Sequence, residues 1–134
     1  MLKQISIFAE NKKGAMGNLT SLLAQNGVNI IALVTNDSAE FGIVRMLVSE
    51  PEKAYDVLQE AGYMVHSDSV IGVLIGDAPG SLDALLQEVT DSNINVDYLY
   101  MSYDRGNAMP IAVIKTVGEY EVAECLKSRG YTLL

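Results

Sequence analysis

Two kinds of hydrophobic pattern alternate along this chain. Some stretches alternate apolar and polar residues, as around Ile5 and Ile7 in the segment 3–9, and this period of two is typical of a strand with one buried face. Other stretches repeat apolar residues every three or four positions, as a helix with one buried face does. In the first half of the chain the patterns predict strands at 3–9, 28–35, 41–49 and 63–66 and helices at 15–26 and 52–61.

Glycine, proline and one polar cluster mark the ends of these elements. Gly27 and Gly62 follow the two predicted helices, and a glycine in the left-handed conformation commonly ends a helix. Pro51 stands where the first turn of a helix tolerates proline. The polar segment 36–40 separates two β-rich segments and predicts a turn between two strands. The predicted order is therefore strand, helix, strand, strand, helix, strand.

The second half of the chain repeats the first. A shift of 66 residues places Gly14 on Gly80, and a shift of 68 places Gly62 on Gly130. We expect the two extra residues to lie in a longer hairpin loop at 102–109, because surface loops tolerate insertions. The second half then has predicted strands at 70–76, 94–102, 109–116 and 131–134 and helices at 80–91 and 119–128.

These patterns predict an α+β protein made of two tandem ferredoxin-like βαββαβ domains, each with an antiparallel sheet. The domains are expected at residues 1–67 and 68–134, with a linker of only residues 67–69. Because so short a linker allows little movement, we expect the domains to share an interface. Strands such as 70–76 are apolar on both faces, although helices would cover only one. We therefore expect a second copy of the protein to cover the other face, in a homodimer or larger oligomer.

Composition narrows the range of functions. The chain has 134 residues and a formal net charge of −8, so its surface should repel the phosphate backbone of nucleic acids. The single cysteine, Cys125, cannot form an internal disulfide and fits a reducing compartment. The N-terminus lacks the apolar segment of a signal peptide, and no apolar run is long enough to span a bilayer. We expect a soluble cytoplasmic protein that binds neither nucleic acid nor membrane.

Two segments resemble the motif of the ACT domain family. In that motif an acidic residue near Pro-Gly-x-Leu precedes a helix, and a small residue, Ile, Asn and Ile open the next strand. The second half of the chain carries Asp77, Pro79, Gly80, Ser81 and Leu82, and then Asn95 and Val96. The first half carries a looser version with Lys13 in place of proline, namely Asn11, Gly14, Ala15 and Met16, and then Asn29 and Ile30. The resemblance covers essentially the whole chain and is to free-standing pairs of ACT domains.

The resemblance implies a regulatory role and a small ligand, usually an amino acid, bound between two domains or two protomers by the motif residues. A glycine lets the backbone approach a ligand closely, and the unpaired N–H groups at the helix start suit a carboxylate. Asn29 and Asn95 offer a donor and an acceptor in one side chain. We expect the glycine loop and the asparagine of a repeat to be neighbours, and we favour the second loop because it keeps Asp77 and Pro79. The alternative is that these residues only shape loops and turns.

Nothing in the sequence assembles a catalytic centre. His66 has no second ligand at metal-binding spacing, and Cys125 is expected to be a small core residue. We expect Arg45 to be a surface or interface residue. We expect Tyr98 and Tyr100 either to pack in the core or at an interface or to line a ligand site. We therefore expect no catalytic residue, no metal and no cofactor. The leading hypothesis is a non-catalytic, amino-acid-binding regulatory protein. The alternative is a regulatory subunit that docks on a catalytic enzyme without using a ligand site of its own.

Overall fold

The computed structural model of the chain describes residues 1–10, 12–35 and 41–134. It divides into two compact units, which we call the first unit (Lys3–Asp68) and the second unit (Ser69–Leu134 together with Met1–Leu2). The division into independently folding domains at 1–67 and 68–134 stays a prediction, because compactness alone does not test it. Each unit is described by itself.

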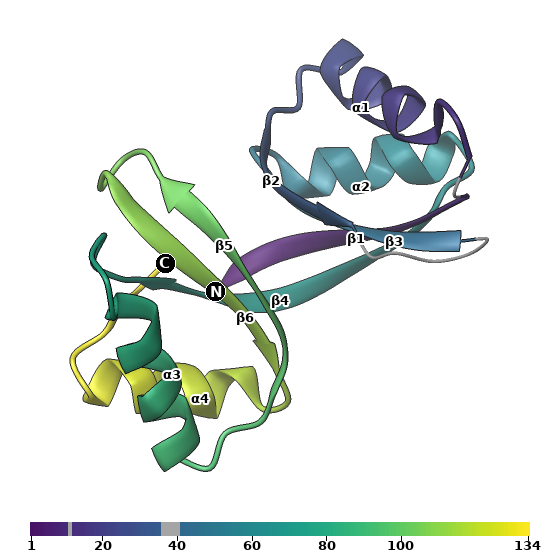
Figure 1. Cartoon of the computed structure of the whole chain (residues 1–134). Coiled ribbons are helices and arrows are strands. Elements are labelled where there is room, and N and C mark those ends of the chain that lie inside the picture. The colour runs from purple at the N-terminus through teal and green to yellow at the C-terminus, as the bar shows by residue number, and fades with distance from the viewer. Residues whose placement is uncertain (11, 36–40) are drawn as a thin grey trace. The chain divides into compact units, whose positions relative to one another are not determined.

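The first unit is a two-layer arrangement of one sheet and two helices. Its sheet has the strand order β2-β3-β1-β4, and α1 and α2 lie on the same face of it (Figure 1). Between the two layers lies a core that includes Ile5, Leu19, Met46 and Leu58, which have no exposed surface. The elements are β1 (Leu2–Glu10), α1 (Ala15–Gln25), β2 (Ile30–Thr35), β3 (Phe41–Val48), α2 (Pro51–Glu60) and β4 (Met64–Leu74).

The second unit repeats this arrangement and uses β4 as its first strand. Its strand order is β5-β6-β4, with β7 paired to the other side of β4, and α3 and α4 lie together on one face (Figure 1). The remaining elements are α3 (Ser81–Asp91), β5 (Val96–Asp104), β6 (Met109–Thr116), α4 (Glu119–Ser128) and β7 (Thr132–Leu133). The predicted α+β fold of two ferredoxin-like βαββαβ units with antiparallel sheets is confirmed.

Strand register shows that the sequence repeat is also a structural repeat. In the first unit Ile5 of β1 lies opposite Met46 of β3, and in the second unit Ile71 of β4 lies opposite Ile114 of β6. These two pairs are related by the same shifts of 66 and 68 residues that align the sequence halves. Strands β2 and β5 also carry a register shift at the same point. The two halves are therefore built to one plan at the level of individual hydrogen-bonded pairs.

Two sequence predictions about the connections are wrong. Residues 67–69, expected to be a linker, lie inside the continuous strand β4. Their polar side chains suggested a break, but Ser6 Oγ donates a hydrogen bond to Asp68 Oδ2 at 3.3 Å within the first unit, so the polar residue is accommodated on a strand. The hairpin loop expected at 102–109 is also shorter, because β5 continues to Asp104, opposite Met109 of β6. The turn expected at 36–40 lies outside the described residues.

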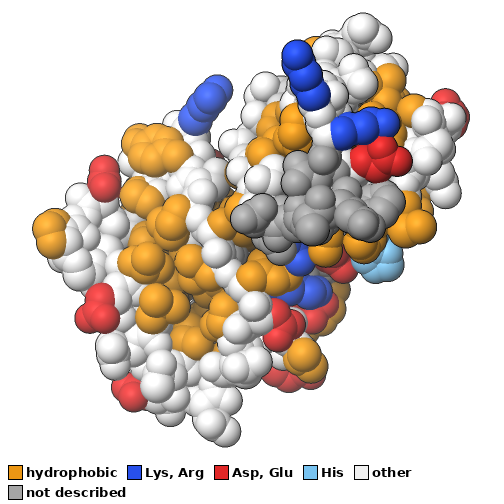
Figure 2. Space-filling model, turned by 45° about the vertical axis from the view of Figure 1, so that its right-hand side comes forward, with side chains coloured by type: hydrophobic (Ala, Val, Ile, Leu, Met, Phe, Trp, Pro, Cys, Tyr) orange, Lys and Arg blue, Asp and Glu red, His pale blue; other side chains and the backbone are white. Residues whose placement is uncertain are grey.

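The burial of side chains in the single chain weakens the argument that a second copy must cover the apolar strands. Val70 and Val113, on strands that are apolar on both faces, have no exposed surface in the single chain, so a partner is not needed to bury them. Figure 2 shows other hydrophobic side chains at the surface of the protein. Ile31 and Leu33 of the edge strand β2 are 50% and 38% exposed. Of the helices in the described ranges, none combines the length and the apolar character needed to cross a membrane.

Candidate ligand-binding site

The glycines of the two motif loops adopt the same unusual conformation. Gly14 and Gly80 are the N-cap residues of α1 and α3, with φ of 85° and 90°. This left-handed region favours glycine because a side chain would bring its Cβ against the following carbonyl oxygen. A Cβ built on either glycine would meet no other group within 4 Å, so the torsion and not the available space requires glycine. Each strand can therefore turn sharply into its helix and leave the helix start open.

At the start of α3 this turn leaves backbone donors without protein partners. The N–H of Ser81 donates to the Ala78 carbonyl at 3.2 Å, and the Gly80 carbonyl accepts from Ala84 at 2.9 Å. Gly80 provides no side-chain cap, and among the described residues no group accepts from the N–H of Leu82 or Asp83. The start of a helix also carries a partial positive charge. The first turn of α3 can therefore receive an anionic group such as a carboxylate.

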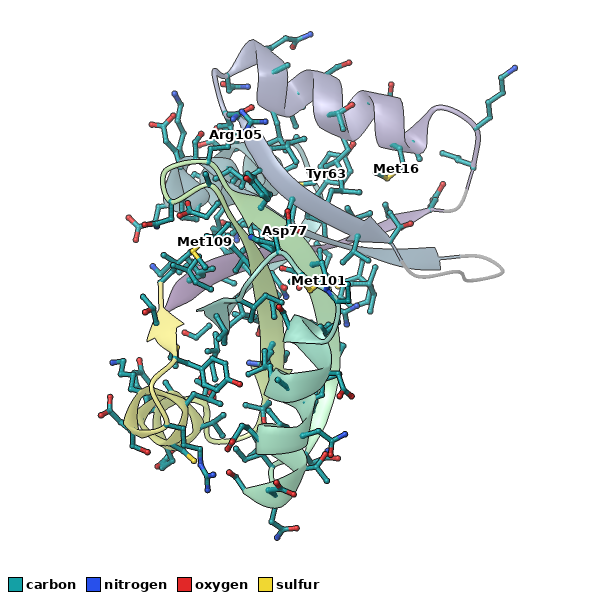
Figure 3. The ribbon with its side chains drawn as sticks, turned by 60° about the vertical axis from the view of Figure 1, so that its left-hand side comes forward. Met16, Tyr63, Asp77, Met101, Arg105 and Met109 are labelled. Carbon is teal, nitrogen blue, oxygen red and sulfur yellow. The ribbon has the colours of Figure 1, made fainter. Side chains whose placement is uncertain are left out.

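A cleft of about 300 Å³ lies at this end of α3. It is formed by the loop before the helix together with the ends of two neighbouring strands, and both Asp77 and Met101, labelled in Figure 3, line it. The loop and helix side comprises Ile75, Gly76, Asp77, Ala78, Pro79, Ser81 and Leu82, and the strand side comprises Met101 of β5 and Pro110 of β6. The structure thus brings the predicted residues 77, 79, 81 and 82 together around one cleft.

The charge of this cleft suits a ligand with an ammonium group. Asp77, which is exposed, is the only charged residue among the described residues that line it. Ser81 Oγ would lie 3.0 Å from a Cβ added to Gly76, so this hydroxyl lies directly against the loop. An ammonium beside Asp77 and a carboxylate at the helix start would place opposite charges on opposite partners. The arrangement can therefore hold a zwitterion, while Met101 and Pro110 add apolar surface.

Sequence reasoning missed Met101 and Pro110. Both lie on the β5–β6 hairpin, about twenty or more residues after the loop, and reach the cleft because β6 pairs with β4. The N–H of Ile75, at the end of β4, donates to the Pro110 carbonyl at 3.1 Å and fixes that neighbourhood. The sequence did predict these strands and their place in one sheet. It did not predict which residues at the ends of the strands would line the cleft.

The first unit has a different charge at the equivalent loop. Lys12 Nζ lies 2.7 Å from Glu10 Oε2, and the carboxylate raises the pKa of Lys12 through a hydrogen bond and direct charge attraction. The first turn of α1 contains no acidic residue. Ala15 and Met16 are half-buried there, and Met16 packs against the core at the beginning of the helix (Figure 3). Asn11 lies outside the described residues, so its predicted role is not addressed by the structure.

The expectation that each glycine loop lies beside the asparagine of its own repeat is wrong. Asn29 and Ser49 exchange hydrogen bonds, with the Asn29 N–H 2.9 Å from Ser49 Oγ, just past the end of β3. The loop before Gly14 leaves β1 at Glu10, which pairs with Phe41 at the other end of β3. At ~3.3 Å per residue these two ends are roughly 26 Å apart. The physical reason is that α1 carries the chain away from the loop before Asn29 begins the next strand.

The second unit shows the same separation. Thr116 Oγ1, at the end of β6, donates to the Asn95 carbonyl at 2.7 Å, whereas the cleft is at the beginning of β6, near Pro110. Asn95 is exposed and Val96 half-buried. Asn29 and Ile30 instead line a separate groove of about 370 Å³ with Thr20, Ser21, Ala24 and Val28 near the C-terminal end of α1. In each unit, therefore, the predicted residues of the glycine loop and the predicted asparagine lie at two separate places.

The other singled-out residues have ordinary surroundings. His66 is largely exposed, with Nε2 3.7 Å from Asp68 Oδ1. Cys125 is half-buried and not part of the core, and its Sγ lies 3.7 Å from Ser92 Oγ, because it faces the side of α4 where α3 ends. Arg45 and Tyr98 are half-buried and Tyr100 is buried. Over residues 1–10, 12–35 and 41–134, no group of three or more His, Cys, Asp or Glu side chains could hold a metal ion.

Comparison with known proteins identifies the family. The sequence matches the family model described as an ACT domain pair over residues 1–127. The chain belongs to the ACT domain pair family. The resemblance inferred from the two loop motifs is thereby confirmed for almost the whole chain.

Solved structures share the architecture of this ACT domain pair. A crystal structure of a protein from Bacteroides thetaiotaomicron is 33% identical, with a TM-score of 0.91, and the match covers 99% of this chain and 91% of that chain. The ligand-free regulatory subunit of aspartate kinase from Thermus thermophilus is 14% identical, with a TM-score of 0.66 and coverage of 94% and 91%. The corresponding subunit from Thermus flavus is 16% identical, with a TM-score of 0.64 and coverage of 92% and 86%. The two kinase subunits show likeness of fold alone. No curated protein sequence matches the chain significantly.

Proposed function

We propose that this protein is a non-catalytic regulatory protein that binds an amino acid, and that the cleft at the start of α3 is part of its ligand site. One observation supports this most directly. The N–H group of Leu82, which has no acceptor among the described residues, stands at the same cleft as the exposed carboxylate of Asp77. A free α-amino acid carries the two complementary charges, because its ammonium and its carboxylate are attached to the same carbon atom.

Each part of the ligand has a partner in this proposal. The α-carboxylate accepts from the first-turn N–H groups of α3, and the α-ammonium faces Asp77. Met101 and Pro110 contact the side chain of the ligand, in keeping with small-molecule sites that combine apolar walls with a few polar anchors.

Regulation then follows from differential binding. A ligand that binds one arrangement of the protein more tightly than another shifts the population toward the first arrangement. Membership of the ACT domain pair family supports this role, and regulatory subunits of aspartate kinase share the fold. An enzyme partner would respond to this shift because it contacts a surface that differs between the two arrangements.

A thermal-shift screen of the twenty amino acids tests the proposal. A ligand that binds only the native state stabilises it by ~2.7 kcal/mol at a concentration of 100 times Kd, so the melting temperature should rise with one amino acid or a small group of them. Asp77→Asn should remove that rise. Asp91→Asn, at the other end of the same helix, is the matched control and should retain it. If no amino acid raises the melting temperature of the parent protein, ligand binding is refuted.

The alternative function is a subunit that docks on a catalytic enzyme without binding a ligand. The observation that favours it is the edge strand β2, where Ile31 and Leu33 are exposed and no residue is charged. An uncharged apolar edge can add to the sheet of another protein. This alternative predicts no response to amino acids in the thermal-shift screen, whereas an Ile31→Lys variant would lose association with the enzyme.

A further inference from the structure

Two large hydrophobic side chains are exposed where β6 turns into α4. Val117, which follows the end of β6, is 84% exposed, more than any other large hydrophobic residue that the structure describes, and Tyr120 in the first turn of α4 is 67% exposed. A hydrophobic residue just before the N-cap commonly packs against a residue further along the helix. Here that residue would be Val122, which is buried, while Val117 remains in solvent. Packing at the helix start therefore does not explain Val117.

The first unit shows that the fold does not need these two side chains. A shift of 68 residues places Ser49 on Val117 and Glu52 on Tyr120. Ser49 Oγ accepts from a backbone N–H at 2.9 Å, and Glu52 Oε1 lies 2.8 Å from Lys3 Nζ. The first unit therefore fills both positions with polar residues that find partners within the unit. Because the same turn folds with either set of residues, folding does not account for the two exposed apolar side chains of the second unit.

Acidic side chains border this apolar pair. Glu119 and Glu121 flank Tyr120 in the chain, and Asp97 of β5 lies by the paired end of β6, next to Val117. In the ranges that the structure describes, no basic side chain forms an ion pair with any of these three acids. Acids in the first turn stabilise a helix start, which accounts for the two glutamates, but Asp97 is on a strand and adds to the same negative surface.

This combination of apolar and acidic groups suits one kind of partner. Tyrosine is enriched among the residues that contribute most to protein–protein binding, and charges at the rim of an interface select the partner and speed its arrival. A second copy that brought the same surface would place acids against acids, and a nucleic acid would bring negative phosphates. A protein segment that combines basic and apolar side chains matches both features.

We propose that the turn from β6 into α4 is a docking surface for a partner protein, which binds it through a basic segment that also carries apolar side chains. Val117 and Tyr120 contact the apolar side chains of that segment, and the bordering acids pair with its lysines or arginines. The surface belongs to the second unit alone, because the first unit has polar residues at the equivalent positions. This inference rests on the regulatory part of the proposed function, in which a partner contacts the protein, and not on ligand binding.

Nuclear magnetic resonance titration of the isotope-labelled full chain tests this surface. The probe is a capped heptapeptide that alternates lysine with leucine. Two control peptides each remove one feature: glutamate replaces lysine in one, and glycine replaces leucine in the other. At ~0.15 M salt, we expect the probe to shift the backbone amides of residues 117–124 and to bind at least about tenfold more tightly than either control. Equal binding of the glycine-containing control, or shifts confined to β2, would overturn the assignment.

Variants that copy the first unit into this surface locate the binding. Val117→Ser and Glu121→Lys introduce the residues that the first unit carries at the equivalent positions, so both proteins should keep a melting temperature close to that of the parent and lose about tenfold in affinity for the probe. Ile31→Ser removes an exposed apolar side chain elsewhere, and Asp56→Lys makes the same change of net charge on α2. These matched controls should bind the probe as the parent does. If they weaken binding equally, the probe responds only to overall charge and apolar surface, and the inference is overturned.

The thermal-shift screen with amino acids is a separate measurement, so the two proposals can fail independently. If the probe does not bind while an amino acid raises the melting temperature, the docking surface is refuted and the proposed ligand site stands. If the probe binds at residues 117–124 and no amino acid raises the melting temperature, the docking surface stands and ligand binding is refuted.

Discussion

Two glycines of α1, three residues apart, provide a direct test of the helix-start geometry. Gly14 is the N-cap and has φ of 85°, whereas Gly17 is the third residue of the helix. A Cβ added at either position would meet nothing within 4 Å. Alanine at the two positions therefore adds the same methyl group to the same helix, without a clash, and only the backbone conformation differs.

The expected effects have opposite signs. Gly14→Ala forces a residue with a Cβ into the left-handed region, which costs ~1–2 kcal/mol. Gly17→Ala replaces the residue with the greatest backbone freedom by the best helix former, which stabilises a helix by ~1 kcal/mol. The two variants should therefore differ by ~2–3 kcal/mol in unfolding free energy, or about 30- to 150-fold in the unfolding equilibrium constant.

Native-state hydrogen exchange measures this difference where it arises. The amide protons of Leu19 and Leu23, the buried residues of α1, report opening of that helix. Urea unfolding followed by circular dichroism gives the global value for the same proteins. Gly14→Ala should exchange faster than the parent and Gly17→Ala more slowly. If Gly14→Ala is as stable as the parent, the left-handed N-cap is not required and the account of the open helix start is wrong.

Three further predictions concern the core, pH and assembly. Leu58→Ala and Leu126→Ala, at equivalent buried positions of the two units, should each lower the unfolding free energy by ~2–5 kcal/mol in urea denaturation, because each leaves a cavity. Lys3 lowers the pKa of Glu52 from its ordinary value of 4.5. This pair therefore stabilises the fold above pH 4.5, and the stabilisation is lost as the pH falls through the lowered pKa. When the melting temperature is measured in an acid titration, the Lys3→Met variant should lack this pH-dependent stabilisation. The protein should be a homodimer by light scattering, and Ile31→Glu on the exposed β2 edge should shift it toward the monomer, whereas a monomeric parent would contradict the prediction.

Local sequence patterns determined the elements and their repetition because these depend on residues close together in the chain. Helix α4 is found at Glu119–Ser128 as predicted, since apolar spacing and a following glycine are local signals. The loop glycines were also identifiable, because the repeat places Gly14 and Gly80 at the same point before a helix. The ACT motif, which combines these local signals, was sufficient to recognise the family.

Tertiary structure alone decided which of these signals meet in space. The sequence places Gly80 and Asn95 in one motif, but a helix between them carries the chain to the other end of the sheet, so they lie at different places in the unit. Met101 and Pro110 reach the cleft beside Asp77 only because strand pairing joins residues far apart in the chain. In the same way, polar residues 67–69 look like a break in the sequence, yet they continue β4, and the side chain of Asp68 accepts a hydrogen bond from Ser6 on the neighbouring strand β1. Motif membership is a property of the local chain, whereas the composition of a site is set by long-range pairing.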